Sequence, residues 1–236
     1  MVNKPSYELL HYFEPFYYIN RMLETKFPIA FLLSLMLMAA GLIISGIHPY
    51  DRLTWFLEIF PVLLVIPLLV VTYSRFPLSN LLYLLITLHA FILEIGGHYT
   101  YARVPIGFWL QDLFDFSRNN FDRIGHLAQG FIPAIALREL LLRTSSLKKS
   151  MWLPLLIIGT CLGMSAFYEL FEWWVALLLH QSADDFLGTQ GDQWDTQWDM
   201  FMALIGAIAA VIFLSRAHDK SLKHLRVRIY EQLAEP

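Results

Sequence analysis

The stretch Pro28–Ile47, PIAFLLSLMLMAAGLIISGI, carries no charged side chain. A helix rises about 1.5 Å per residue, so roughly 20 apolar residues of this kind cross the hydrocarbon core of a bilayer. The run follows an aromatic-rich stretch and carries no small-residue cleavage site. We therefore interpret it as a membrane span and not as a removable signal peptide.

The composition of the whole chain agrees with this first span. Of 236 residues, 57% are hydrophobic and 16% are charged, and the mean hydropathy is +0.51. Soluble domains contain about 45–50% apolar and about 25% charged residues, so the composition argues against a water-soluble globule. A net charge of −3 argues against nucleic acid as a partner. The single cysteine, Cys161, excludes an intrachain disulfide and a cysteine-based metal cluster.

The sequence predicts an all-α, polytopic membrane protein with six transmembrane helices in one bundle. The predicted spans are Pro28–Ile47, Trp55–Tyr73, Leu78–Gly97, Asp122–Leu142, Trp152–Leu179 and Asp199–Leu214. Residues 28–215 then form one transmembrane domain. Residues 1–27 form an interfacial cytoplasmic segment, and residues 216–236 form a cytoplasmic amphipathic helix.

The lysines and arginines predict the orientation. If the N-terminus is cytoplasmic, twelve of the seventeen basic residues lie inside. The long connection His180–Trp198 has no basic residue, and we place it outside together with His98–Phe121. Both termini are therefore expected on the cytoplasmic side of the membrane.

Counting along each span at about 1.5 Å per residue places polar residues of four helices at one depth, in the outer leaflet. Each pair has helical spacing, shares one helix face and can point into a bundle. The pairs are Glu94/His98, Asp122/His126, Glu169/Glu172 and Asp195/Asp199.

Charged side chains within a span cost at least a few kcal/mol each and mark functional sites. Three arrangements would relieve this cost. A divalent metal could bind the cluster, the carboxyl groups could share protons, or nearby arginines could form ion pairs with them. His98 and His126 favour zinc, manganese or iron over calcium, which prefers oxygen ligands.

The metal hypothesis assigns a role to each polar residue of the outer leaflet. The predicted metal ligands are Asp122, His126, Glu169 and Asp199. Glu172 or Asp195 would act as the general base. Asn119 or Asn120 could cap the N-terminus of the fourth span, whose free N–H groups could hold a substrate phosphate. The residues predicted to bind this phosphate are Arg103, Arg118, Arg123 and Asn120. The residues predicted to support the ligands from behind are Glu94, His98, Tyr99 and Asp192.

The remaining polar residues of the spans have structural interpretations. His89 is predicted to be a core histidine with a hydrogen-bond partner. Arg138 and Glu139 are predicted to form an interfacial pair near the inner end of their span, and Cys161 to serve packing.

Four stretches together carry a family resemblance. They are His98–Pro105 (HYTYARVP), Arg118–Pro133 (RNNFDRIGHLAQGFIP), Ser165–Trp174 (SAFYELFEWW) and Phe186–Gly206 (FLGTQGDQWDTQWDMFMALIG). With them the chain closely resembles the YjdF-like family of bacterial inner-membrane proteins, which has no assigned function. The resemblance extends from about Ile43 to Phe213.

Shorter motifs are similar, more distantly, to the VanZ-like family. They are D-x-x-x-H at Asp122–His126, Tyr168–Glu169 with Glu172, and Asp195/Asp199 before Ala203–Gly206. Glu172 stands where that family often has glutamine. VanZ-like proteins are linked to glycopeptide resistance and envelope lipids, so this resemblance implies a membrane location and a polar core.

The sequence favours a membrane-embedded, metal-dependent hydrolase or phosphatase whose substrate is the headgroup of an envelope lipid. The alternative is a non-enzymatic lipid-binding or scaffold protein in which the charges form ion pairs. A proton-coupled transporter is a third hypothesis. It fits less well because the polar residues gather at one depth and the sequence shows no inverted repeat.

Overall fold

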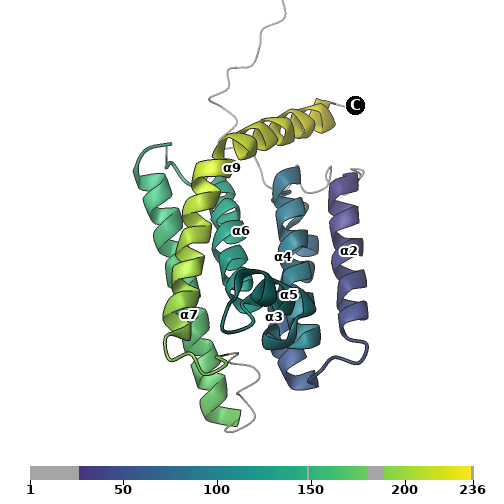
Figure 1. Ribbon diagram of the computed structural model, residues 1–236. Helices are drawn as coiled ribbons and strands as arrows, with labels where there is room; N and C mark the ends of the chain where they lie inside the picture. Colours follow the sequence, from purple (N-terminus) through teal and green to yellow (C-terminus); the bar gives the residue numbers. More distant parts are fainter. Residues whose placement is uncertain (1–26, 148, 180–188, 235–236) are drawn as a thin grey trace, which may run out of the picture.

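The computed structural model describes residues 27–147, 149–179 and 189–234, and every regular element in these ranges is a helix (Figure 1). The elements are α2 (Ile29–Ser45), α3 (Arg52–Thr72), α4 (Asn80–Tyr99), the 3-10 helix η2 (Tyr101–Arg103), α5 (Pro105–Phe114), α6 (Phe121–Thr144), α7 (Trp152–Leu179) and α9 (Asp195–Ala234). The predicted all-helical class is confirmed for this part of the chain. The predicted interfacial segment 1–27 lies outside it, apart from Phe27.

Four of these helices, α3, α4, α7 and α9, are long and apolar enough to cross a membrane. Helix α2 is apolar but shorter, at 17 residues. Many large apolar side chains on the outside of the bundle are exposed, among them Val71, Leu178 and Phe213, each more than 70% exposed. An apolar outer surface of this extent is expected where lipid surrounds the protein.

Helix α6 lies at the centre of one half of the bundle and packs against α4, α7 and α9. Its closest neighbour is α9. A Cβ atom added at Gly130 would overlap the carbonyl oxygen of Ala203, and one added at Gly206 would overlap that of Leu127. Small residues let helix backbones approach closely in membranes, where apolar burial alone does not drive association. These two glycines therefore fix the α6–α9 crossing.

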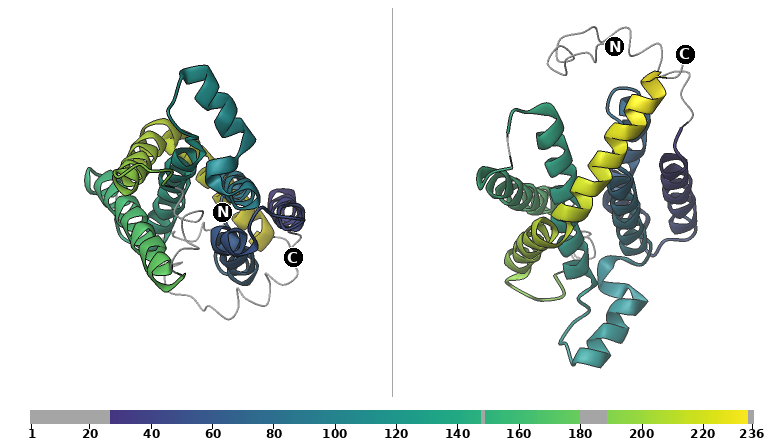
Figure 2. Two further views of the ribbon diagram at one scale, coloured as in Figure 1. Left: turned by 60° about the horizontal axis from the view of Figure 1, so that its bottom comes forward. Right: turned by 90° about the horizontal axis from the view of Figure 1, so that it is seen from above.

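The other half of the bundle contains α2, α3 and α4. The aromatic rings of Phe31, Tyr73 and Tyr83 pack together there, with ring centroids 4.4 Å apart for Phe31–Tyr73. Helix α4 contributes to the cores of both halves. The views in Figure 2 show α7 (green) set apart from the group of α2, α3 and α4 (purple to blue).

Helix α3 begins at a side-chain cap outside the apolar segment. The Oδ1 atom of Asp51 accepts a hydrogen bond from the backbone N–H of Thr54 at 2.7 Å. This bond holds the pKa of the Asp51 carboxyl below its ordinary value, because it stabilises the charged form.

The end of the chain differs from the prediction. A span ending at Leu214 and a separate helix from residue 216 were expected, but α9 runs unbroken from Asp195 to Ala234 and bends across the end of α4 (Figure 1). No glycine or proline follows Gly206 before residue 236, so nothing in this sequence terminates the helix. Ser221 anchors it by accepting a hydrogen bond from the backbone N–H of Leu81 at 3.2 Å.

The close α6–α9 crossing makes a stability prediction. Replacing a helical glycine with alanine ordinarily stabilises a helix by about 1 kcal/mol. We expect Gly130→Ala to destabilise the protein by about 1–3 kcal/mol instead, since the added methyl group meets a backbone carbonyl. Thermal unfolding in detergent measures the change. Gly159→Ala is the control, because a Cβ there has no neighbour within 4 Å; equal melting temperatures for the two variants would contradict the crossing.

Candidate functional site

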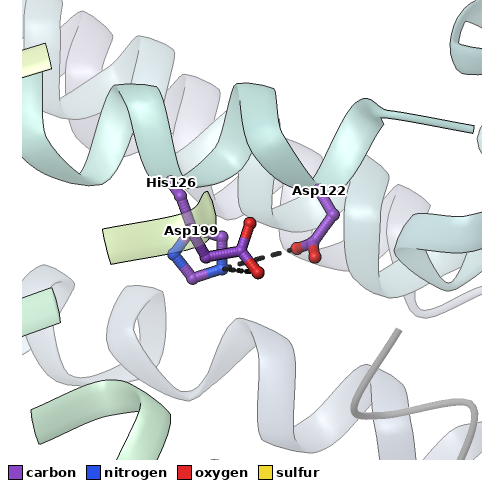
Figure 3. A group of neighbouring side chains, drawn as sticks. All are labelled: Asp122, His126 and Asp199. Carbon is purple, nitrogen blue, oxygen red and sulfur yellow. Dashed lines mark ion pairs between the residues drawn. The ribbon is translucent and has the colours of Figure 1, made fainter. Parts of the chain in front are cut away.

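His126 lies at the centre of a cluster to which three helices contribute. Its Nε2 atom is 3.5 Å from Oδ1 of Asp122, one turn earlier on α6. It is 3.7 Å from Oε1 of Glu169 on α7 and 4.0 Å from Oδ2 of Asp199 on α9. Figure 3 shows Asp122, His126 and Asp199 converging on one point. All four predicted metal ligands are therefore neighbours.

The other nitrogen of the His126 ring orients it. Nδ1 is 2.9 Å from Oε1 of Gln129, an amide oxygen that accepts a hydrogen bond from the ring when Nδ1 carries the hydrogen. In the neutral imidazole Nε2 then presents a lone pair to the carboxylates. Metal-binding histidines almost always have a partner of this kind on the nitrogen that faces away from the metal.

The carboxylates of the cluster are buried without sufficient hydrogen-bond partners. Glu169 is 8% exposed and Asp199 is 2% exposed. Oε1 of Glu169 and Oδ1 of Asp199 have no hydrogen-bond partner among the described residues. Buried polar atoms without a partner are costly, so these oxygens indicate a ligand or a shared proton at this place.

The geometry of the cluster suits a small divalent ion. One ligand atom each from Asp122, His126 and Asp199 lies within 4.8 Å of the others. Ligands of a zinc ion lie about 2.0–2.2 Å from it, which brings them about 3–4 Å from one another. A contraction of the order of 1 Å would thus complete the site. A mixed nitrogen and oxygen ligand set fits zinc, manganese or iron.

Two further acids adjoin the cluster. Glu172 on α7 is buried and lies close enough to Glu169 and Asp122 for electrostatic interaction. Glu58 on α3 is 4% exposed and lines the same cavity as Asp122 and Tyr168. No role was predicted for Glu58, although its position near the start of its span, like that of Asp122, would have placed it at the level of the cluster.

The arginines near the cluster form ion pairs with aspartates. Nη1 of Arg118 is 2.5 Å from Oδ1 of Asp195 and 2.8 Å from the carbonyl oxygen of Thr189. Nη2 of Arg123 is 2.8 Å from Oδ2 of Asp192. These pairs join the start of α6 to the start of α9. Because Asp195 pairs with Arg118, Glu172 is the better placed of the two predicted general bases.

Of the two asparagines before α6, Asn119 has a structural role. Oδ1 of Asn119 accepts a hydrogen bond from the N–H of Phe121 at 3.1 Å, and its Nδ2 donates to the carbonyl oxygen of Val104 at 3.0 Å. Asn120 occupies the cap position, but its side chain makes no capping bond. The N–H group of Phe121 is therefore already occupied, which weakens the prediction that Asn120 and this helix end bind phosphate.

Four predicted site residues lie elsewhere. Nδ1 of His98 is 2.8 Å from the carbonyl oxygen of Ser45, the last residue of α2. His98 therefore faces α2. Glu94 lies on the same face against Gly41, so neither residue supports the metal ligands. Tyr99 is 40% exposed and packs edge-on against His98. Arg103 is exposed, and its guanidinium stacks on the ring of Tyr50, with Cζ 4.2 Å from the ring centroid.

A cavity of about 1130 Å³ extends from the cluster between α3, α4, α6 and α7. Asp122, His126 and Glu172 line it at one end, and most of the other lining side chains are apolar. His89 is half-buried and lines it as well, which differs from the expected core position.

The opposite end of α6 carries a second buried network, where an interfacial pair was predicted. Arg138 and Glu139 are 4% and 0% exposed. His218 of α9 lies between them, with Nδ1 2.7 Å from Nη1 of Arg138 and Nε2 3.0 Å from Oε2 of Glu139. Glu139 also pairs with Arg143 at 2.7 Å. The continuation of α9 beyond Leu214 brings His218 to this place.

The family model described as a predicted membrane protein (DUF2238) matches residues 30–220. The chain belongs to this family. It is 49% identical over 202 residues to the inner membrane protein YjdF of Escherichia coli, covering 86% of this chain and 97% of that protein. No solved structure matches. The resemblance to YjdF-like proteins is thus confirmed, and the chain is an integral membrane protein of the DUF2238 family.

The region that defines a DUF2238 protein contains the candidate site and the network at the opposite end of α6, since both lie within residues 30–220. The cluster around His126 is therefore part of the shared region of the family and not of an added segment.

The buried ion pair between Arg118 and Asp195 predicts a large effect on stability. We expect Arg118→Met to destabilise the protein by about 3–5 kcal/mol, because it leaves a carboxylate buried without its cation. Arg103→Met, at an exposed residue that stacks on Tyr50, should cost about 1 kcal/mol or less. Thermal unfolding of the purified variants measures both. Equal effects would show that the Arg118 pair is not a stabilising contact.

Proposed function

We propose that α2, α3, α4, α6, α7 and α9 all cross the inner membrane, with both termini in the cytoplasm. Helix α6 has 24 residues and a length of about 36 Å, sufficient for a span despite its charged residues. At the end opposite the cluster, Arg143 donates a hydrogen bond to the carbonyl oxygen of Pro77 and Arg228 to the side chain of Asn80. Basic residues favour the cytoplasmic side, so the cluster lies toward the outer leaflet.

The function that this geometry supports best is metal-dependent hydrolysis of a lipid ester or phosphoester in the cell envelope. The observation that carries the proposal is the set of unpartnered carboxylate oxygens around Nε2 of His126, at the polar end of an apolar cavity. Asp122, His126, Glu169 and Asp199 would hold the ion. When bound, it would lower the pKa of a coordinated water and polarise the scissile bond.

Glu172 is the residue best placed to accept a proton during this reaction. In hydrolysis, the water oxygen forms the new bond to phosphorus or carbon, and the bond to the leaving alcohol breaks. Glu172 would take the proton that the water loses and return it to the leaving oxygen. Its position in the wall of the cavity gives it access to a bound substrate.

Gln129 acts through His126 and not on the substrate. Its amide oxygen fixes the imidazole with Nε2 toward the carboxylates. The ion pairs of Arg118 and Arg123 hold the N-terminal ends of α6 and α9 together, which keeps Asp122 and Asp199 within reach of one ion.

Metal content provides the test of the proposed function. We expect the purified wild-type protein to retain about one equivalent of zinc, manganese or iron, and His126→Ala to lose it because a ligand is missing. Elemental analysis by mass spectrometry measures both. His224→Ala is the control, since His224 is exposed and lies on α9 at the other end of the bundle. Wild-type protein without metal, or His126→Ala with undiminished metal, would refute the proposal.

The role of Gln129 makes a second, quantitative prediction. Loss of the partner behind a metal-binding histidine typically lowers metal affinity about 10–100-fold. We expect Gln129→Leu to show this loss in a metal titration, while Gln129→Glu restores most of the affinity because its carboxylate still accepts the Nδ1 hydrogen. Should Gln129→Leu bind metal as tightly as the wild type, the contact with Gln129 does not orient His126 for metal binding.

A further inference from the structure

The cavity beside the cluster is an elongated apolar cleft between two spans that do not pack closely against each other within the described residues, α3 and α7. One stripe of each helix lines it. On α7 the stripe contains Thr160, Gly163, Met164 and Phe167, and on α3 it contains Pro61, Val65, Leu68 and Thr72. Helices α4 and α6 form the floor. Between two membrane spans, the open side of such a cleft faces hydrocarbon.

The length of the cleft matches a lipid chain. Its lining on α3 extends from Glu58 to Thr72, a rise of about 21 Å at 1.5 Å per residue. One leaflet contributes about half of a hydrocarbon core of about 30 Å. The cleft is thus long enough for the whole acyl chain of a lipid in one leaflet.

The polarity of the cleft matches an amphiphile. Glu58, Asp122 and Glu172 line the end at the cluster, whereas Thr72, Phe76 and Leu140 line the far end. A lipid whose chain fills the apolar part would therefore bring the bond between its chain and headgroup to the candidate metal ligands.

We propose that this cleft binds one acyl chain of a glycerophospholipid, which enters laterally between α3 and α7. The inference rests on the proposed function and names its substrate class, a lipid with an ester or phosphoester bond just above the acyl chain. A lipid chain is the occupant that the setting favours, because acyl chains are the solvent on the open side of the cleft. Met164 and Phe167, 50% and 61% exposed, then contact a bound chain.

Two glycines of α7 allow the cleft to be filled without disturbing the fold. A Cβ atom at Gly163 or at Gly159 has no neighbour within 4 Å, so either position accepts a large side chain. Gly163 lines the cleft, and Gly159, one turn away, does not. Helix α3 offers a second matched pair, because Leu68 lines the cleft and Leu64 does not, although both are more than half exposed.

The experiment uses the full-length protein in vesicles of phosphatidylethanolamine and phosphatidylglycerol. They contain a phosphatidylethanolamine with a photoreactive diazirine in the middle of one acyl chain. After irradiation, peptide mass spectrometry locates the adducts. We expect adducts at Val65 and Met164 in the wild type. Gly163→Trp and Leu68→Trp should lower the adduct yield about tenfold, because a tenfold loss of affinity corresponds to about two methylene groups of the lipid chain that are no longer buried. Gly159→Trp and Leu64→Trp should leave it unchanged.

Each outcome decides between occupants. Adducts confined to outward-facing residues, or a yield insensitive to Gly163→Trp and Leu68→Trp, would overturn the proposal. Cross-links from the cleft to a second copy of the chain, or to residues 1–26, would overturn it as well. Metal content measured on the same samples separates the two proposals. A cleft adduct in protein without metal refutes the metal-dependent hydrolase and supports the lipid site. Bound metal without a cleft adduct refutes the lipid site and leaves the metal centre standing.

Discussion

Removing carboxylates from water is costly, and this cost governs how the bundle is assembled. At the end of α6 opposite the cluster, Glu139 is fully buried but pairs with Arg143 and His218. Near the cluster, Asp195 pairs with Arg118. These acids are neutralised by the protein itself and need no ligand. Glu169 and Asp199 differ, since each retains an oxygen without a partner among the described residues.

Glu94 shows why an unpartnered acid alone does not make a site. Both of its oxygens lack a hydrogen-bond partner within the described part of the chain. It lies against Gly41 in the interface of α2 and α4. The cluster around His126 differs because several potential ligands, carried by three helices, face one another. Convergence, and not burial, distinguishes the candidate metal centre.

The sequence was sufficient to predict that several polar residues lie at one level along the bundle, but not the direction in which each one points. A constant rise per residue, together with the alternation of the spans, placed Asp122, Glu169 and Asp199 at one level, and the structure brings them together. The same count placed Glu94 and His98 there, yet they face α2. Their rotation about the helix axis depends on which neighbour α4 packs against, and depth does not determine this.

The ion pairs between helices could not be predicted from the sequence. The unbroken course of α9 could have been expected from the absence of glycine and proline after Gly206, but the contact of His218 with Glu139 depends on how α6 and α9 cross. Arg118 carried no signal to distinguish a phosphate ligand from a partner of Asp195, because both roles require the same guanidinium.

The glycine contact between α6 and α9 has a consequence for the choice of acid on each helix. Gly130 and Gly206 set the two backbones at a separation that short side chains can bridge, and both helices contribute aspartates to the cluster. Helix α7, whose Gly159 and Gly163 touch nothing, contributes glutamates, which are one methylene longer. The separation of the helices thus corresponds to the length of the acidic side chains: the two closely packed helices contribute aspartates, and the helix without such a glycine contact contributes glutamates.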